Sequence, residues 1–361
     1  MDSLTQITLG AAVGEAVAGH KVGRKAAMYG AFCGLLPDLD IALYPVLDEI
    51  QRIEVHRGLS HSFVFAMLVA PAAAYLLQRI HKRAPAGFRD WLMLVFLGIV
   101  THPILDYLTI YGTQLFQPFS DYPAAFGSIF IIDPLYTLPL LFCLIGAWLI
   151  RGGPESKRRL VLIGLAISST YLVWTIGAKL KAEATFERSL GEQGIRYDRI
   201  FTAPTPLNSV LWMGMAEDRE GDRLLIGLHS FLDADNDITF REIPKESHLI
   251  ADVLDQRPLD RLMWFSRGWY RVEPADPNTG RGITLMDLRF GRSDAYLNLE
   301  GEHIFVFELI ADPPESRNFV MFRRVPPDIG GIRGENIARL WRRLQGDRSV
   351  VKNATTPPEK D

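Results

Sequence analysis

Histidines and aspartates interrupt the long apolar runs that make up the first half of this chain. They fall in four short segments, at residues 37–40, 56–62, 102–106 and 133–134. Ionisable side chains are costly at membrane depth, so in membrane helices they usually face the protein interior and mark function. Imidazole and carboxylate groups are also the donors that hold zinc, manganese or magnesium. The sequence therefore predicts a metal site inside a helical membrane domain.

The composition changes sharply near residue 178. Up to that point apolar residues dominate, whereas beyond it charges are dense and no run approaches 18 apolar residues. A net charge of −3 over 361 residues excludes a strongly basic nucleic-acid binder, so we expect no nucleic-acid partner. Glu15 and the lack of a positive first segment argue against a cleaved signal peptide. We predict a helical membrane domain over residues 1–178, with about five to six helices.

Several apolar segments are long enough to cross a bilayer. The candidates are residues 62–80, 91–111, 126–150 and 160–178, with a weaker one at 26–46 and a short, buried or re-entrant helix at 4–18. Gly10 and Gly14, and again Gly30 and Gly34, have the four-residue spacing of small side chains that lets membrane helices approach closely. The alternative for these glycines is a merely loose backbone.

Lysine and arginine orient the predicted spans. The connections at 20–25, 79–89 and 151–159 are basic, whereas residues 112–125 contain neither lysine nor arginine. The positive-inside rule assigns the basic connections to the cytoplasm. A multi-pass protein with an extracytoplasmic C-terminal domain follows, and every candidate ligand then falls at the outer membrane face.

The spacing of His102 and Asp106 suits a shared ion. Residues four apart project from one face of a helix, so this pair can contact a single metal, or alternatively form a histidine–aspartate hydrogen bond. Pro103 could kink the helix between them.

The segment at 56–62 offers two more histidines. Gly58 permits a tight turn between His56 and His61, and Ser60 is placed to cap the helix that begins near His61. Arg57 lies between the histidines and is suited to an anionic group, phosphate above all. The alternative is an ordinary polar loop with an interfacial arginine.

Asp38 and Asp40 follow Pro37. Side chains two apart diverge on a regular helix, but an extended backbone at a proline-broken helix end would let both face one side. Two such carboxylates could both bind metal, or one could orient a histidine; one could also be a solvated helix end. Asp133 fits a helix cap, and Glu15 is a weaker candidate ligand.

Together these segments resemble a known family. The opening Met1-Asp2-Ser3-Leu4-Thr5-Gln6 and the segments at 36–40, 56–62 and 102–109 resemble the YdjM family of inner-membrane-associated proteins, which are expected to be metal-dependent hydrolases. The resemblance covers roughly the first 120 residues. It implies a ligand set of Asp38, Asp40, His56, His61, His102 and Asp106. It also suggests a distant relation to zinc-dependent phospholipase C and P1-type nucleases. Gln6 departs from the family, since many members have histidine there.

The resemblance and the residues together favour a membrane-bound hydrolase of a phosphoester such as a lipid headgroup. Zinc is the expected metal, with manganese or magnesium as alternatives, and the bilayer of the inner membrane is the expected partner. Arg57 would hold the anionic group and Asp40 would act as general base. Two alternatives stay open: a membrane scaffold with a structural metal, which Gln6 favours, and a metal ion transporter.

The second half predicts a mainly β domain with an antiparallel sheet at residues 179–346, after a linking helix near 178–190. The predicted strands are 211–215, 224–228, 238–240, 262–265, 283–286 and 303–307, with turns at 217–222 and 274–282. Asp233, Asp235 and Asp237 alternate as in a calcium loop, but the spacing beyond them favours an ordinary acidic turn. We expect the tail at 347–361 to be disordered.

Overall fold

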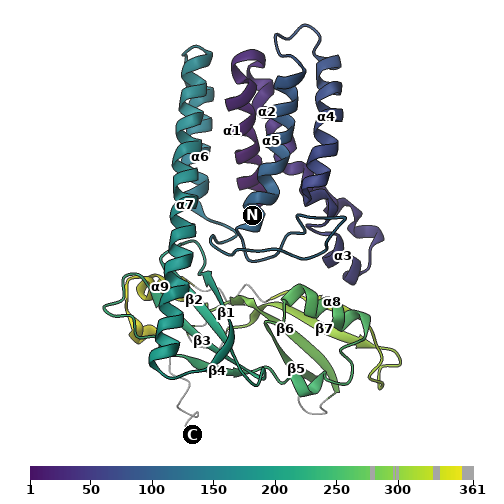
Figure 1. The fold of residues 1–361 in the computed structure, drawn as a ribbon, viewed down its shortest axis with the longest axis vertical. Coiled ribbons are helices and arrows are strands. Elements are labelled where there is room, and N and C mark those ends of the chain that lie inside the picture. The colour runs from purple at the N-terminus through teal and green to yellow at the C-terminus, as the bar shows by residue number, and fades with distance from the viewer. Residues whose placement is uncertain (277–280, 296, 298–300, 328–333, 352–361) are drawn as a thin grey trace. The chain divides into compact units, whose positions relative to one another are not determined.

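A computed structural model of the chain describes residues 1–276, 281–295, 297, 301–327 and 334–351 (Figure 1). It divides into two compact units. Unit 1 comprises Met1–Gly177 with Pro206–Asn208, and unit 2 comprises Ala178–Thr205 with the chain from Ser209 onward. The fold class agrees with the sequence prediction: a helical N-terminal region with four candidate apolar spans precedes two four-stranded antiparallel sheets.

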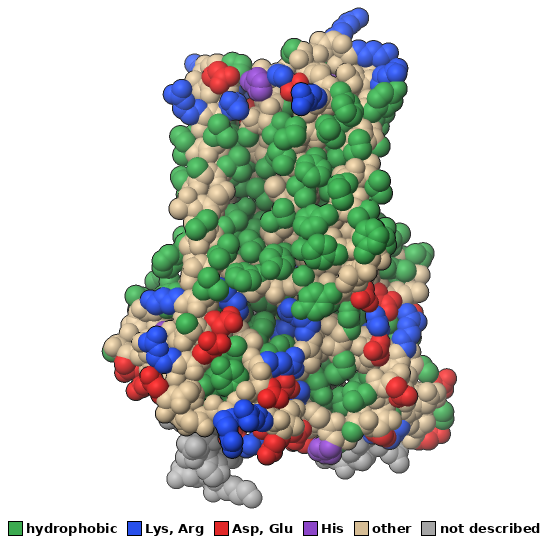
Figure 2. Space-filling model, viewed as in Figure 1, with side chains coloured by type: hydrophobic (Ala, Val, Ile, Leu, Met, Phe, Trp, Pro, Cys, Tyr) green, Lys and Arg blue, Asp and Glu red, His purple; other side chains and the backbone are tan. Residues whose placement is uncertain are grey.

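Unit 1 is built from helices. In chain order they are α1 (Ser3–Val22), α2 (Arg24–Leu35), the 3-10 helix η1 (Leu36–Val46), α3 (Glu49–Val55), the 3-10 turn η2 (Leu59–His61), α4 (Phe63–Ile80), α5 (Phe88–Tyr107), α6 (Pro134–Leu149) and α7 (Pro154–Glu192). The four candidate spans are Arg24–Val46, α4, α5 and α7, and α6 is a shorter apolar helix. Apolar side chains cover the flank of these helices in Figure 2, as lipid contact requires.

Helices α1 and α2 are packed at backbone contact. A Cβ atom added at Gly10 would lie 2.3 Å from the carbonyl oxygen of Gly30, and one at Gly30 would lie 2.1 Å from that of Gly10. A Cβ atom at Gly14 would lie 2.2 Å from the carbonyl oxygen of Ala26. Only glycine fits at these distances, so the four-residue glycine spacing does mark close helix packing, as predicted.

Helix α7 is longer than the sequence suggested. The predicted span at 160–178 and the predicted linking helix at 178–190 are one uninterrupted helix of 39 residues. That is about 58 Å of helix, roughly twice the hydrocarbon thickness of a bilayer. The change from apolar to charged residues alters what the helix contacts but does not end it. Two other boundaries differ, because α5 ends at Tyr107 and α6 begins at Pro134.

The two ends of unit 1 differ in chemistry. Lys21 forms an ion pair with Asp90 at 2.7 Å, and Arg24 donates to the carbonyl oxygen of Trp148 at 3.5 Å. These contacts bring the three basic connections together at one end of the helices. At the other end, the Gln6 side chain on α1 donates to the carbonyl oxygen of His102 at 3.3 Å. The histidine- and aspartate-bearing segments therefore lie at the end opposite the basic connections.

Unit 2 contains two separate sheets. The first has strand order β1-β2-β3-β4 and the second β5-β6-β7-β8, all antiparallel. The strands are β1 (Tyr197–Pro204), β2 (Leu211–Asp218), β3 (Arg223–Ser230), β4 (Arg241–Pro244), β5 (Tyr270–Asp276), β6 (Arg281–Arg292), β7 (His303–Ala311) and β8 (Phe319–Val325). The predicted strands at 211–215, 224–228, 283–286 and 303–307 all lie within these elements.

Two predicted strands are wrong. Residues 262–265 belong to helix α8 (Arg257–Ser266), in which Leu259, Leu262 and Phe265 are buried at helical spacing. Pro258, in the first turn, was the missed helix-start signal. Residues 238–240 precede β4 without joining it, because Ile238 is buried beside Phe186 of α7 instead.

The C-terminal part of the described chain is held by arginines. Helix α9 (Gly334–Leu344) is tied to Asp233 through Arg343 at 2.6 Å, and Arg348 bonds Asp235 at 2.6 Å. Two carboxylates of the acidic turn, those of Asp233 and Asp235, are thus paired with cations, as in an ordinary turn. Arg348–Val350 form a turn of 3-10 helix. Of the tail predicted at 347–361, residues 352–361 lie outside the described residues.

Candidate metal centre

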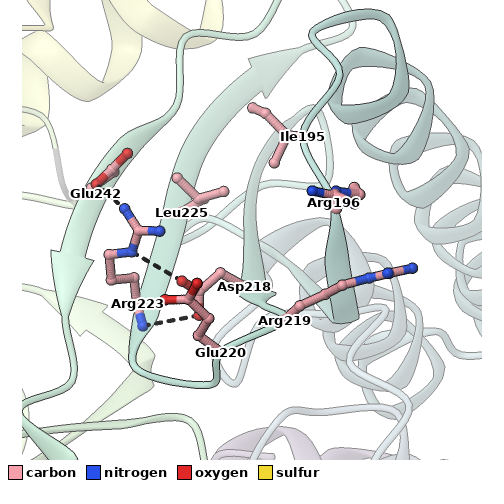
Figure 3. A pocket seen from close by; sticks show the side chains of 8 residues that line it. All are labelled: Ile195, Arg196, Asp218, Arg219, Glu220, Arg223, Leu225 and Glu242. Carbon is pink, nitrogen blue, oxygen red and sulfur yellow. Dashed lines mark hydrogen bonds and ion pairs between the residues drawn. The ribbon is translucent and has the colours of Figure 1, made fainter.

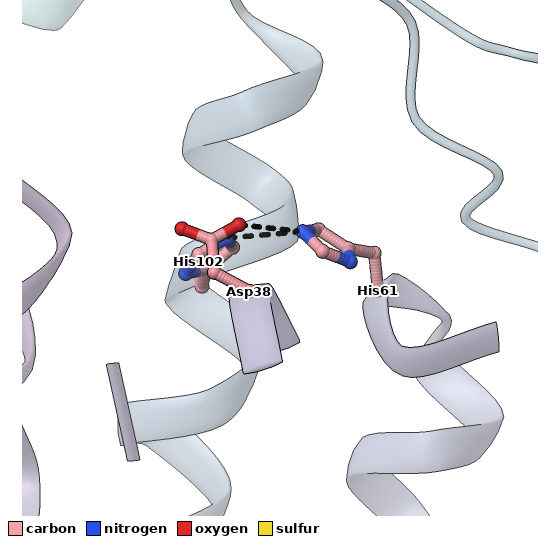
Figure 4. Close-up of side chains that lie close together, drawn as sticks. All are labelled: Asp38, His61 and His102. Atoms are coloured by element: carbon pink, nitrogen blue, oxygen red, sulfur yellow. Dashed lines mark hydrogen bonds and ion pairs between the residues drawn. The ribbon is translucent and has the colours of Figure 1, made fainter. Parts of the chain in front are cut away.

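Three side chains from three separate elements converge at one end of unit 1. Asp38 comes from η1, His61 from the end of η2 and His102 from α5 (Figure 4). The Nε2 atoms of the two histidines are 3.1 Å apart, and Asp38 Oδ1 lies 3.4 Å from each of them. The two imidazoles and the carboxylate thus form a triangle of facing donor atoms.

The dimensions of this triangle fit a bound ion. Ligands held about 2.0–2.2 Å from a tetrahedral zinc ion stand about 3.3 Å from one another. The observed separations of 3.1 and 3.4 Å match that spacing. These separations fit a direct hydrogen-bond network less well, because two facing imidazole nitrogens and a carboxylate have few protons to share.

Asp106 supplies a fourth donor. Its Oδ2 lies 3.7 Å from the Nε2 atoms of both His61 and His102, so the predicted pair on α5 does face one point. Gln6 donates to Asp106 Oδ1 at 3.0 Å, and the terminal amine of Met1 contacts the same oxygen. Gln6 Oε1 is a buried acceptor that receives no hydrogen bond, and Asp106 Oδ2 is paired with Arg57 Nε at 3.0 Å. The unbonded Gln6 oxygen is thus a buried acceptor that a cation could satisfy.

Each of the two histidines has a hydrogen-bonding partner at Nδ1, on the side of the ring away from the triangle. The carbonyl oxygen of Gly34 lies 2.6 Å from His102 Nδ1, which therefore carries the proton and leaves Nε2 free to coordinate. Ser60 Oγ lies 3.0 Å from His61 Nδ1. Burial lowers the pKa of the His61 imidazole to about 4, so the ring is in the neutral form that binds metals. Both rings are thus set for ligation through Nε2.

Asp40 and His56 lie one layer outward from this triangle. His56 Nδ1 is 3.1 Å from Asp40 Oδ1, while Asp40 Oδ2 accepts from the Arg57 amide at 3.1 Å and from Ser60 Oγ at 3.2 Å. The backbone at 36–46 is a 3-10 helix and not the extended segment predicted after Pro37. With three residues per turn, side chains two apart diverge, so Asp38 and Asp40 approach opposite nitrogens of His61, Nε2 and Nδ1 respectively.

Arg57 is a buried cation beside the donors. Its Nε lies 3.0 Å from Asp106 Oδ2 and its Nη1 donates to Thr109 Oγ1 at 3.2 Å, while the guanidinium lies 4.5 Å from the centre of the Tyr111 ring. Sequence reasoning identified Arg57 but missed the roles of Thr109 and Tyr111. Their position directly after α5, one turn beyond Asp106, was the available signal.

The remaining sequence candidates have other roles. Asp133 caps α6 by accepting from the amide of Leu135 at 3.0 Å, and its other oxygen accepts from Tyr171 at 2.8 Å, in agreement with the cap expectation. Ser62, and not Ser60, caps α4, because the η2 turn delays the start of that helix. Glu15 is buried against Gly19 of its own helix and is not part of the donor group.

Unit 2 contains a cavity of about 370 Å³ at the β2–β3 turn (Figure 3). Arg223 bridges it by bonding Asp218 at 2.9 Å and Glu242 at 3.3 Å. Arg196, Arg219 and Glu220 line the rest and are exposed. None of the side chains that line this cavity is a histidine or a cysteine, and Arg223 is paired with two of its acids. Within the described residues, the group of converging metal-type donors lies in unit 1.

Comparison with known proteins gives a consistent result. The model of the family described as YdjM inner membrane protein matches residues 1–182. A curated relative, the uncharacterized protein YfhP of Bacillus subtilis (strain 168), is 28% identical over 183 residues, which cover 48% of this chain and 51% of the relative. The chain thus spans about half the length of that relative. No solved structure matches. The family match covers the part of the chain that carries the donor group.

Proposed function

Because this chain belongs to the YdjM family of inner membrane proteins, and because its family region brings Asp38, His61 and His102 together with Asp106 beside them, we propose that it is a membrane-bound metal-dependent hydrolase. The proposed substrate class is a phosphoester such as a lipid headgroup. The observation that carries the proposal is the spacing of Asp38, His61 and His102, which suits one ion.

Each residue has a proposed part. Asp38, His61, His102 and Asp106 would hold the metal, with zinc favoured because two imidazoles and carboxylates form a set that zinc accepts. A divalent metal there would supply a Lewis acid and acidify a water molecule. Arg57 would attract an anionic phosphoryl group toward the donors, since its charge lies 3.0 Å from Asp106.

Asp40 and His56 form the outer pair of the proposed site. Asp40 is the candidate general base of the sequence prediction, and it already holds His56 Nδ1 at 3.1 Å. Its three hydrogen bonds also fix the loop that presents Arg57 and His61. We therefore assign Asp40 and His56 to proton handling and orientation, and not to primary ligation.

The proposed location of the site is the extracytoplasmic face. The basic connections lie at the opposite end of unit 1, and the positive-inside rule assigns that end to the cytoplasm. Leu39, Ile41 and Leu59, close in sequence to the site residues, are exposed apolar side chains. Such side chains suit a substrate that stays in the bilayer, which favours a lipid over a soluble ester. A reporter fused after residue 154 should then be cytoplasmic and one fused after residue 250 exported.

The direct test is hydrolysis by the full-length, metal-loaded protein. A set of lipid and water-soluble phosphoesters would be incubated in parallel with wild type and with His102→Ala. We expect phosphate or headgroup release from a lipid ester by wild type and its loss in the variant. His303→Ala, which alters a buried histidine of unit 2, is the matched control. Wild type that binds metal stoichiometrically yet cleaves none of the esters contradicts the proposal.

A scaffold with a structural metal is the second candidate. It is favoured by the closure of the site, since His61, His102 and Asp106 are buried and the Asp38 side chain is only 16% exposed. In that case metal removal lowers the melting temperature while no ester is cleaved at any stage. The same preparation therefore separates the two functions.

A further inference from the structure

Two large apolar side chains of helix α9, in unit 2, face outward. Ile337 and Trp341 are four residues apart, so they share one face of the helix, and they are 57% and 60% exposed. The side that meets the sheet is fixed by Arg343, which is 2% exposed and bonds both Asp233 and the carbonyl oxygen of Leu228. A helix of a soluble domain normally buries its apolar stripe, so this orientation calls for an apolar partner.

The anchor points of α9 lie at one end of the first sheet. Arg343 bonds residues at the close of β3 and just after it, and the backbone at Gly346 meets that of Leu232. Leu232 is itself 56% exposed. Three exposed apolar side chains, from Leu232, Ile337 and Trp341, thus belong to one attachment region.

Helix α7 shows at which end of unit 2 this region lies. Within unit 2, Lys181 of α7 lies 4.6 Å from the centre of the Phe231 ring, while Leu190, nine residues later, packs with Ala216 and Leu225. Antiparallel pairing places Leu225 at the far end of β3 from Phe231. The α9 end of the sheet is therefore the end beside residue 178, where the apolar run of α7 finishes.

We propose that α9 and Leu232 form a second membrane contact, in which Trp341 and Ile337 insert into the headgroup region of the bilayer beside residue 178 of α7. Tryptophan prefers this region, because its ring has an apolar body and a polar edge. Arg342, Arg343 and Arg348 are paired with acids of unit 2, so the proposed contact rests on the apolar side chains and not on the charge of the headgroups. This inference is independent of the proposed hydrolase activity.

Spin labelling of the full-length protein tests the contact. Cys33 and Cys143 would be replaced by alanine, and single cysteines introduced as Trp341→Cys and, one turn earlier, Ile337→Cys. Val320→Cys is the matched control, since Val320 is an exposed apolar residue on the edge strand β8. The labelled proteins would be placed in nanodiscs of equal parts phosphatidylcholine and phosphatidylglycerol, and collision with oxygen and with a water-soluble nickel chelate measured.

The expected result is that labels at 337 and 341 lose most of their nickel collisions and keep their oxygen collisions, while the label at 320 collides with nickel freely. Two results overturn the proposal. Nickel access at 337 and 341 equal to that at 320 means that the helix faces water. Protection from both nickel and oxygen means that protein covers the helix, either another part of the chain or a second copy.

Discussion

The two units differ in which groups compensate their buried carboxylates. In unit 2, buried acids have their own cations: Asp287 bonds Arg289 at 2.5 Å with both side chains fully buried, and Asp233 bonds Arg343 at 2.6 Å. In unit 1, Asp38 faces two imidazoles whose Nε2 atoms point at each other, and Asp106 faces the same imidazoles as well as Arg57 and the terminal amine of Met1. A buried charge persists only when it is compensated. The first arrangement is complete within the protein, whereas under the proposed function a metal would complete the second.

The site in unit 1 has more carboxylates than positive charges. Three carboxylates, from Asp38, Asp40 and Asp106, lie around the donor triangle, against the guanidinium of Arg57 and the terminal amine of Met1. Burial keeps the His61 imidazole neutral, so that ring adds no charge. One divalent cation would reverse the imbalance, which is the physical reason to regard this cluster as a metal site and the clusters of unit 2 as structural.

The largest expected effect is the loss of bound metal when a histidine of the donor triangle is replaced. His61→Ala and His102→Ala should each remove bound metal from purified protein, with affinity falling by more than about 100-fold because a ligand, and not only its support, is lost. Elemental analysis after dialysis measures this. His229→Ala, which removes a buried histidine of unit 2, should leave the metal content unchanged. Equal metal content in all three variants would remove the distinction between the units.

The next effect tests the self-contained pairing of unit 2. Arg289→Ala leaves Asp287 buried without its cation and should cost about 3–5 kcal/mol of stability. The double variant Arg289→Met with Asp287→Leu should recover most of that loss, because it removes both charges. Urea unfolding of the β unit in the full-length protein measures both, and metal content should stay at the wild-type level. A single variant as stable as wild type would mean that the pair is not buried in solution.

The next prediction concerns the pH dependence of stability that the buried His303 of unit 2 should cause. Burial, together with the positive charges of Arg292 and Arg271, lowers the pKa of His303 to about 3. The unfolded chain therefore binds a proton below pH 6.5 that the folded unit refuses, and stability falls as pH drops. Between pH 6.5 and pH 5 the loss should be about 2 kcal/mol.

The comparison for this pH effect is His303→Gln, which cannot titrate. Its free energy of unfolding, measured by urea at several pH values, should change less between pH 6.5 and pH 5 than that of wild type. Parallel curves for the two proteins would show that His303 is not the group responsible.

The packing of α1 on α2 supports the metal site from behind. A Cβ atom at Gly34 would lie 2.4 Å from the carbonyl oxygen of Gln6, so Gly34→Ala should separate the helices at a cost of about 1–3 kcal/mol. It should also move the carbonyl that orients His102 and weaken metal binding about 10-fold or more. Gly153→Ala, where a Cβ atom meets nothing within 4 Å, is the control. Equal metal affinity in both variants would contradict this support.

Local patterns were enough to predict much of this molecule. The apolar runs gave the helical region, the glycine spacing gave the α1–α2 contact, and the four-residue spacing placed His102 and Asp106 on one face. These are properties of residues close in sequence on a regular helix. The assignment of Asp133 to a helix cap succeeded for the same reason.

What the sequence did not predict depends on irregular backbone or on distant contacts. The 3-10 geometry of residues 36–46 separates Asp38 from Asp40, and no spacing argument distinguishes it from an extended segment. The separation of His56 from the triangle follows from the conformation of the loop at 56–61. The strand predicted at 262–265 failed because a short apolar run fits both a helix and a strand. The hydrogen bond from His102 to Gly34 joins residues 68 apart in the chain.

The smallest expected effect is that of Arg57→Lys, which distinguishes a catalytic site from a structural metal site. Arg57→Lys keeps the positive charge near Asp106 but loses the planar fork and the contact with the Tyr111 ring. Lysine has the same backbone preferences as arginine at the positive φ of 58°, so the loop gains no new strain. Metal content should therefore stay close to that of wild type.

Turnover of a phosphoester should nevertheless fall about ten-fold, which corresponds to about 1.4 kcal/mol of transition-state contact. Arg52→Lys, in the same connection but paired with Glu49 instead of Asp106, should leave turnover unchanged. The four-donor group alone, acting as a structural site, gives no turnover in any of these proteins. Loss of metal in Arg57→Lys would show instead that Arg57 acts by holding Asp106 in place, as an arginine of unit 2 holds its acid, and the contrast between the units would then be one of degree.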